Sequence, residues 1–143
     1  MKKIFFMKNL MTKPFYDLGI LVLRIISGSI MFFAHGLGKI TSFSDMLHNF
    51  ADPFGLGTEI TFIVAVLAEG ICSILIVLGL FTRLAVLPLI ITMLTAAAIV
   101  HANDPFNVAE LPYLYAAIFF TILITGPGRY SIDASLYGRG KRK

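Results

Sequence analysis

Four long apolar segments dominate this sequence, and they limit what the chain can fold into more than any other feature. They lie at about residues 17–37, 61–81, 84–100 and 112–126, with short connections between them. A helix needs roughly 20 apolar residues to cross the hydrocarbon core of a bilayer. Because 57% of the 143 residues are hydrophobic and only 14% are charged, few polar residues remain to cover a soluble globule. The sequence therefore predicts an all-α membrane protein with four transmembrane helices.

Short connections between consecutive segments favour an up-and-down bundle, and we expect residues 1–143 to form one domain. In the first long connection, Phe43, Met46, Leu47 and Phe50 recur at helical spacing. Such a pattern is typical of a short helix that lies on the membrane surface with its apolar face down. We therefore expect an interfacial helix in this external loop.

Basic residues flank the segments on one side of the predicted membrane. They are Lys2, Lys3, Lys8, Lys13, Arg83, Arg129, Arg139, Lys141, Arg142 and Lys143. The two longer connections contain Lys39 as their only lysine or arginine. Since positively charged flanks stay on the cytoplasmic side, both termini are expected in the cytoplasm. Orientation and anionic lipid account for these charges, so no nucleic-acid partner is expected.

Two charged residues, Arg24 and Glu69, lie inside the first and second apolar segments. Each such charge costs about 2.5–3.5 kcal/mol at the centre of an inserting helix. The two residues are on consecutive antiparallel helices, so we expect an Arg24–Glu69 ion pair inside the bundle. Such a pair can serve either to fix the helix register or to form part of a functional site.

A polar stripe follows from Arg24 along the first segment. His35 comes eleven residues after Arg24, which at ~100° per residue returns it to within about 20° of the same face. Gly28 and Met31 lie on that face, and Lys39 is slightly rotated from it. We expect this face to turn inward. Gly28 and Gly36 would then let a neighbouring helix or a flat ligand approach closely.

His101 ends the third segment on the same outer side. It is expected to complete a cluster with His35, Lys39 and Glu69 around a cavity that opens to the outer leaflet, because titratable groups that converge at membrane depth mark ligand or proton sites. Simpler explanations stay open. His35 and Lys39 can extend to the interface, and His101 can complement a helix dipole. No spacing typical of a metal site or a nucleotide-binding loop occurs.

Several segments together resemble the DoxX family of small bacterial four-helix membrane proteins. They are LVLRIISGSIMFFAHGLGKI, LAEG followed by LGLFTRLA, and the closing GPGRYSID, and the resemblance covers roughly residues 17 to 137. It implies a multi-pass protein of the inner membrane with a link to redox processes, because the family takes its name from a subunit of a thiosulfate:quinone oxidoreductase. The family-type positions in this sequence include Arg24, Gly28, His35, Gly36, Lys39 and Glu69, without implying a role for any of them.

The leading hypothesis is a redox-linked inner membrane protein that binds a quinone-like or other small redox molecule in its bundle. His35, Lys39 and Glu69 are the predicted catalytic residues. The predicted ligand-binding residues are Arg24, Gly28, Met31, Gly36 and His101. The protein would then be a component of an oxidoreductase, with electrons supplied by the ligand or a redox partner subunit. Two alternatives stay open: a non-catalytic scaffold or assembly subunit, and a small transporter that uses Glu69 as a proton site.

Overall fold

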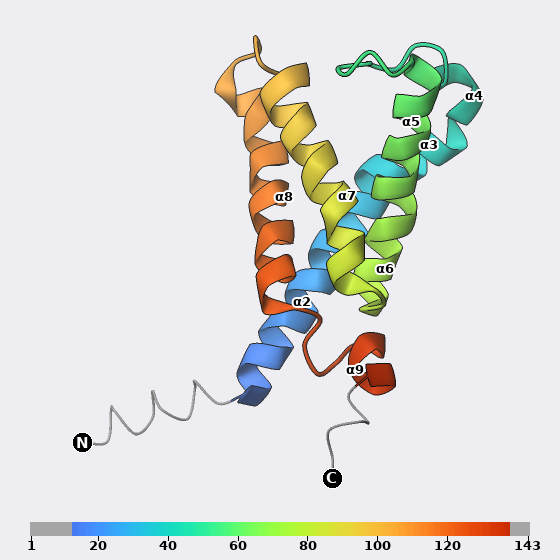
Figure 1. Ribbon diagram of the computed structural model, residues 1–143. Coiled ribbons are helices and arrows are strands. Elements are labelled where there is room, and N and C mark those ends of the chain that lie inside the picture. Colours follow the sequence, from blue (N-terminus) through green and yellow to red (C-terminus); the bar gives the residue numbers. More distant parts are fainter. Residues whose placement is uncertain (1–12, 138–143) are drawn as a thin grey trace.

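The structure is a computed structural model that describes residues 13–137. Within this range four helices are long and apolar enough to cross a membrane: Phe15–Thr41, Thr58–Leu78, Thr82–Val100 and Phe106–Thr125. They run up and down beside one another as a bundle (Figure 1). The prediction of an all-α, four-helix membrane protein is therefore confirmed.

Each of the first three spanning helices contains one π-helical turn, labelled η, in which the helix is locally wider than an α-helix. In chain order the spanning elements are α2 (Lys13–Met31), η1 (Phe32–Gly36), α3 (Leu37–Thr41), α5 (Thr58–Val66), η2 (Leu67–Cys72), α6 (Ser73–Leu78), α7 (Thr82–Thr95), η3 (Ala96–Val100) and α8 (Phe106–Thr125). The first spanning helix therefore continues to Thr41, past its predicted end at residue 37, so Lys39 lies within the helix.

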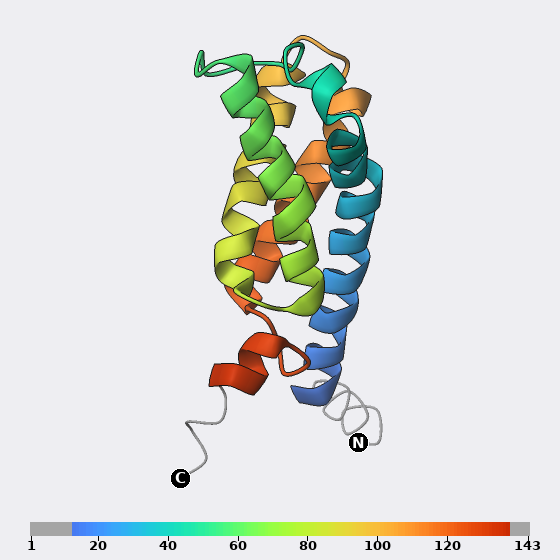
Figure 2. The same ribbon diagram turned by 90° about the vertical axis from the view of Figure 1, so that its right-hand side faces the viewer.

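Two short helices lie at opposite ends of the bundle (Figure 2). The helix α4 (Phe43–Met46) occupies the predicted interfacial position but is a single turn. The rings of Phe43 and Phe50 pack against Phe62 of α5, with centroids 5.2 and 5.1 Å apart. The other short helix is α9 (Ile132–Tyr137). We call the α4 end the outer end and the α9 end the inner end, following the orientation predicted from charge.

The core of the bundle is apolar, and so is most of its outer surface. The buried cluster consists of Met31, Ile76, Ala85, Val86, Leu89, Met93, Tyr115, Ala116, Phe119 and Ile122. Large apolar side chains such as Phe33, Leu84 and Ile124 are about two-thirds exposed. A continuous apolar surface of this kind is unfavourable in water, whereas the acyl chains of a bilayer can cover it.

Glycines set the spacing between the first two spanning helices. Gly28 lies so close to α6 that an added Cβ would come within 2.9 Å of the Ser73 carbonyl oxygen, and a Cβ on Gly36 would overlap the carbonyl of Glu69. Lipid tails are as apolar as leucine, so close backbone packing of this kind is what holds helices together in a membrane. The close helix approach expected at Gly28 and Gly36 is therefore present.

The inner end is held by the segment that follows α8. The Asp133 carboxylate accepts hydrogen bonds from the backbone N–H groups of Phe81 (2.8 Å) and Thr82 (2.9 Å), so it caps the first turn of α7. Gly79, with φ +69°, makes the preceding turn. Its carbonyl accepts a hydrogen bond from the Asp133 N–H at 2.9 Å. The last described residues therefore lock the α6–α7 turn in place.

Candidate functional site

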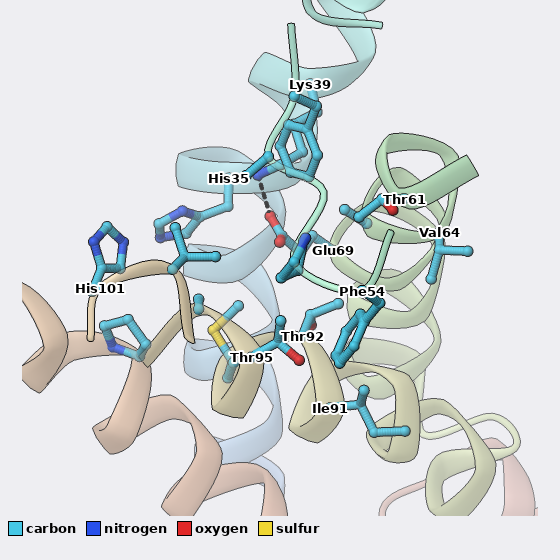
Figure 3. A pocket seen from close by; sticks show the side chains of 18 of the residues that line it. His35, Lys39, Phe54, Thr61, Val64, Glu69, Ile91, Thr92, Thr95 and His101 are labelled. Carbon is cyan, nitrogen blue, oxygen red and sulfur yellow. Dashed lines mark hydrogen bonds and ion pairs between the residues drawn. The ribbon is translucent and has the colours of Figure 1, made fainter. Parts of the chain in front are cut away.

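A cavity of about 480 Å³ lies at the outer end of the bundle. All four spanning helices contribute to its wall, and the connection between α4 and α5 covers it with Phe50, Ala51, Pro53, Phe54 and Leu56. The close-up in Figure 3 shows the Lys39 and Glu69 side chains meeting in this wall, with His35 beside them. Four of the eight predicted site residues therefore line one cavity: His35, Lys39, Glu69 and His101.

The main polar feature of the cavity is the ion pair between Lys39 and Glu69. The Lys39 Nζ lies 2.5 Å from the Glu69 Oε2, and the two side chains are only 14% and 8% exposed. The same ammonium group lies 5.9 Å from the centre of the Phe50 ring, within the range of a cation–π contact. In the part of the chain that the structure describes, the Glu69 Oε1 receives no hydrogen bond. One carboxylate oxygen is therefore free to meet a ligand.

The π-helical turns contribute residues to this cavity. His35 is in η1, Glu69 is in η2, and Ala96 and Val100 are in η3. A π-helical turn has a poorer hydrogen-bond pattern than an α-helix and is frequently found at functional sites. Their concentration around one cavity indicates that the local helix geometry is adapted to the cavity rather than to close packing.

Ser73 stabilises the turn that carries Glu69, although sequence reasoning did not identify it. This fully buried hydroxyl donates towards the carbonyl oxygens of Glu69 (2.5 Å) and Gly70 (2.7 Å). Widening of the helix at η2 weakens the ordinary backbone hydrogen bonds, and a serine one turn later can replace them. The sequence feature that could have identified Ser73 is its position four residues after an intramembrane glutamate.

Tyr115 of α8 also went unnoticed in the sequence. Its ring packs edge-on against His35, with ring centroids 6.1 Å apart, and it stacks on Phe119 at 5.8 Å. Tyr115 is 6% exposed and lines the cavity. A tyrosine well inside a transmembrane segment places a hydroxyl among apolar side chains, which is the signal that could have identified it.

His101 lies at the cavity rim, where η3 ends. Its Nδ1 is 2.7 Å from the Asp104 Oδ2, and the side chain is 32% exposed. This contact closes the turn that leads towards α8. His101 therefore has a structural partner in addition to its place on the cavity wall.

The expected Arg24–Glu69 ion pair is wrong. Glu69 pairs with Lys39, whereas the Arg24 Nη2 donates a hydrogen bond to the Tyr130 carbonyl at 2.7 Å. Arg24 packs against Gly79, which is ten residues beyond Glu69, or ~15 Å along a helix. Gly36, twelve residues after Arg24 on the same helix, is the residue that packs against Glu69, so Arg24 lies ~18 Å too far towards the inner end to reach it.

Gly28, Met31 and Gly36 do not line the cavity. Gly28 and Gly36 are occupied by helix contacts, and Met31 is fully buried in the apolar core. The polar stripe does face inward as expected, since Arg24 is 1% exposed and Gly28 is buried. Its residues are spread from the inner end to the cavity instead of meeting at one point.

Asp52 organises the connection that covers the cavity. Its carboxylate accepts hydrogen bonds from the N–H groups of Gly57 (2.8 Å) and Leu56 (3.0 Å) and from the Thr61 hydroxyl (2.9 Å). The Gly57 hydrogen bond, with smaller contributions from the others, holds the pKa of Asp52 below its ordinary value. This residue therefore ties the cover to the start of α5 in its ionised form.

A family model matches this chain. The DoxX model covers residues 19–102, a range that contains His35, Lys39, Glu69 and His101. No solved structure matches the chain.

Three relatives match along most of their length. "Putative oxidoreductase CatD" of Bacillus subtilis is 31% identical, with 89% of this chain and 92% of that protein covered. "Inner membrane protein YqjF" of Escherichia coli is 31% identical over 87% of this chain and 96% of the relative. "Inner membrane protein YphA" of the same organism is 32% identical, and the match covers 85% of this chain and 97% of YphA.

Proposed function

Since this chain belongs to the DoxX family and is a multi-pass inner membrane protein, we propose that it binds a quinone-like redox molecule in the outer cavity. The observation that carries the proposal is the Lys39–Glu69 pair, which lies in the wall of an otherwise mostly apolar cavity. An ion pair that served only to join two helices would be expected among packed side chains. Here it borders open space.

The cavity suits a flat aromatic ring with carbonyl oxygens. Small-molecule sites are commonly ~300–1,000 Å³, mostly apolar, with a few polar groups that fix orientation, and this cavity measures about 480 Å³. Phe50, Phe54 and Tyr115 supply aromatic surface, and the Thr95 hydroxyl adds a polar group to the same wall. These features match the ring and the polar edges of a quinone.

The titratable residues around the cavity can handle the protons of quinone chemistry. Conversion of a quinone to a quinol takes up two electrons and two protons. The Lys39 ammonium can donate a hydrogen bond to one carbonyl oxygen, and Glu69 and His35 can pass protons as general acid and base groups. The electrons would come from a redox partner protein. The similarity to the Bacillus subtilis protein named "Putative oxidoreductase CatD" supports this assignment.

Thermal unfolding of the purified protein tests the proposal. A ligand at one hundred times its Kd stabilises the folded state by about 2.7 kcal/mol, so a benzoquinone should raise Tm. Glu69→Gln should weaken quinone binding about tenfold, because it removes the carboxylate that holds the Lys39 ammonium in position to donate to a quinone carbonyl.

The matched control is Glu59→Gln, also on the second spanning helix. Glu59 is 59% exposed and pairs with His48 outside the cavity, so this variant should bind quinone like the native chain. If no quinone raises Tm, or if both variants bind equally well, the quinone site is excluded. The ion pair would then be better explained by the scaffold alternative.

A further inference from the structure

A second hollow lies between α2 and α8, beside the outer cavity. It measures about 510 Å³, and it borders the outer cavity at three shared residues, His35, Leu111 and Tyr115. The His35–Tyr115 ring contact therefore stands where the two spaces meet. Figure 1 shows α2 crossing the bundle obliquely.

The surface of this hollow is suited to hydrocarbon. Except at His35, Tyr115 and Ser27, its walls consist of glycine, alanine, valine, leucine and isoleucine. The Ser27 hydroxyl already donates a hydrogen bond to the Leu23 carbonyl at 2.7 Å, so it does not require a polar ligand. The remaining walls attract apolar chains only.

The shape of the hollow is elongated, and its side faces lipid. On the first spanning helix its lining runs from Gly19 in α2 to His35 in η1, which corresponds to ~24 Å along a helix. Several wall residues, including Ile26 at 54% exposed and Leu114 at 55%, are also part of the outer surface of the bundle. The hollow is therefore a groove that is open to the bilayer along its length.

We propose that this groove holds the hydrocarbon tail of the ligand whose ring occupies the outer cavity. The inference rests on the proposed function and names its substrate class, a lipid-soluble quinone with a long prenyl or alkyl chain. The chain would leave the ring beside His35 and Tyr115 and run along α2 towards the inner end. Such a ligand reaches the cavity sideways from the bilayer. The cover on the aqueous side of the cavity then does not need to open.

The test compares two probes in lipid nanodiscs: a benzoquinone without a tail, and the same ring with a decyl chain. Ala34→Phe fills the groove near the junction, and Gly19→Leu fills its far end, where an added side chain meets open space. Ala34→Phe should weaken binding of the decyl-quinone about tenfold, because the apolar contact of the tail is lost. Gly19 lies ~24 Å from His35 along the helix, beyond the reach of a ten-carbon chain, so Gly19→Leu should leave decyl-quinone binding unchanged. Binding of the tail-less quinone should change less than about twofold.

Ala117→Phe is the matched control, since Ala117 is exposed on α8 and lines neither hollow. Partitioning of the decyl-quinone into lipid is the same for every variant and cancels in the comparison. Equal changes for the two probes in Ala34→Phe, or no change in that variant, would overturn the tail assignment even if Glu69→Gln still weakens tail-less quinone binding. If Glu69→Gln bound the tail-less quinone as tightly as the native chain does, the proposed function itself would be excluded.

Discussion

The Lys39–Glu69 pair at the outer end and Arg24 at the inner end are both buried charges, but their surroundings differ. The outer pair borders a cavity of about 480 Å³. Arg24 is 1% exposed, lines neither hollow, and packs directly against Gly79. Charge inside the membrane carries the same penalty at either end. The difference indicates that the inner charge helps to hold the fold, whereas the outer pair borders open space, as the proposed ligand site requires.

The two ends also differ in helix geometry, because π-helical turns surround the outer cavity and α-helical segments form the inner end. In residues 13–137 the π-helical turns all contribute to the outer cavity or flank it. The inner end is built from α-helical segments, tight turns and the cap that Asp133 provides for α7. We therefore expect substitutions at the inner end to change stability, and substitutions at the outer end to change ligand binding.

Gly79→Ala should give the largest effect. Gly79 has φ +69°, and an added Cβ would overlap the Arg24 guanidinium and approach the Ser131 Cβ. Backbone strain and overpacking together should lower the free energy of unfolding by about 2–4 kcal/mol. The measurement is denaturant-induced unfolding in mixed micelles.

The matched control for this substitution is Gly38→Ala. Gly38 lies in α3, and an added Cβ meets no atom within 4 Å. Alanine there should be neutral or stabilising by up to about 1 kcal/mol, because of its higher helix propensity. If both variants were equally stable, the tight packing described for the inner end would be incorrect.

A double-mutant cycle tests which charges interact. For Lys39→Met and Glu69→Gln we expect a coupling free energy of about 1–3 kcal/mol, because the two groups are in direct contact. For Arg24→Met and Glu69→Gln the effects should add within about 0.5 kcal/mol, since these residues share no partner. Strong coupling between Arg24 and Glu69 would restore the pairing predicted from the sequence.

Asp133→Ala should have a smaller effect that is confined to stability. It removes the cap of α7, which we expect to cost about 1–2 kcal/mol in the free energy of unfolding. Asp45→Ala, in the exposed first turn of α4, serves as the control. Quinone affinity should be unchanged in both variants. A clear loss of affinity in Asp133→Ala would show that the two ends are not independent.

The apolar segments were sufficient to predict the fold, because hydrophobic length alone determines which stretches can span a bilayer. The polar stripe on the first helix was also readable, since a period of 3.6 residues sets which face turns inward. The sequence did not predict that Glu69 pairs with Lys39 rather than with Arg24. This pairing depends on how the first two spanning helices are shifted along each other, and this shift is set by the contacts of Gly28 with Ser73 and of Gly36 with Glu69.

Residues that build the cavity from neighbouring helices were harder to identify. Ser73 and Tyr115 matter because of π-helical geometry and a contact between distant helices, and neither follows from local periodicity. The roles given to His35, Lys39, Glu69 and His101 as site residues stay predictions. Their meeting at one cavity is what the structure adds.

The smallest expected effect concerns the cover of the outer cavity and its dependence on pH. The Gly57 N–H hydrogen bond holds the pKa of Asp52 below its ordinary value, which is about 3.9 in a free chain. Stabilisation of the cover by ionised Asp52 is therefore complete above that value and is lost as pH falls through the lower pKa of the folded state.

The chain contains no tryptophan, so Phe54→Trp supplies a fluorescent reporter in the cover. Its emission should be constant at neutral pH and change only below about pH 4. Adding Asp52→Asn should abolish this change, because an amide does not titrate there. A transition that persists without the Asp52 carboxylate would show that another group holds the cover over the cavity.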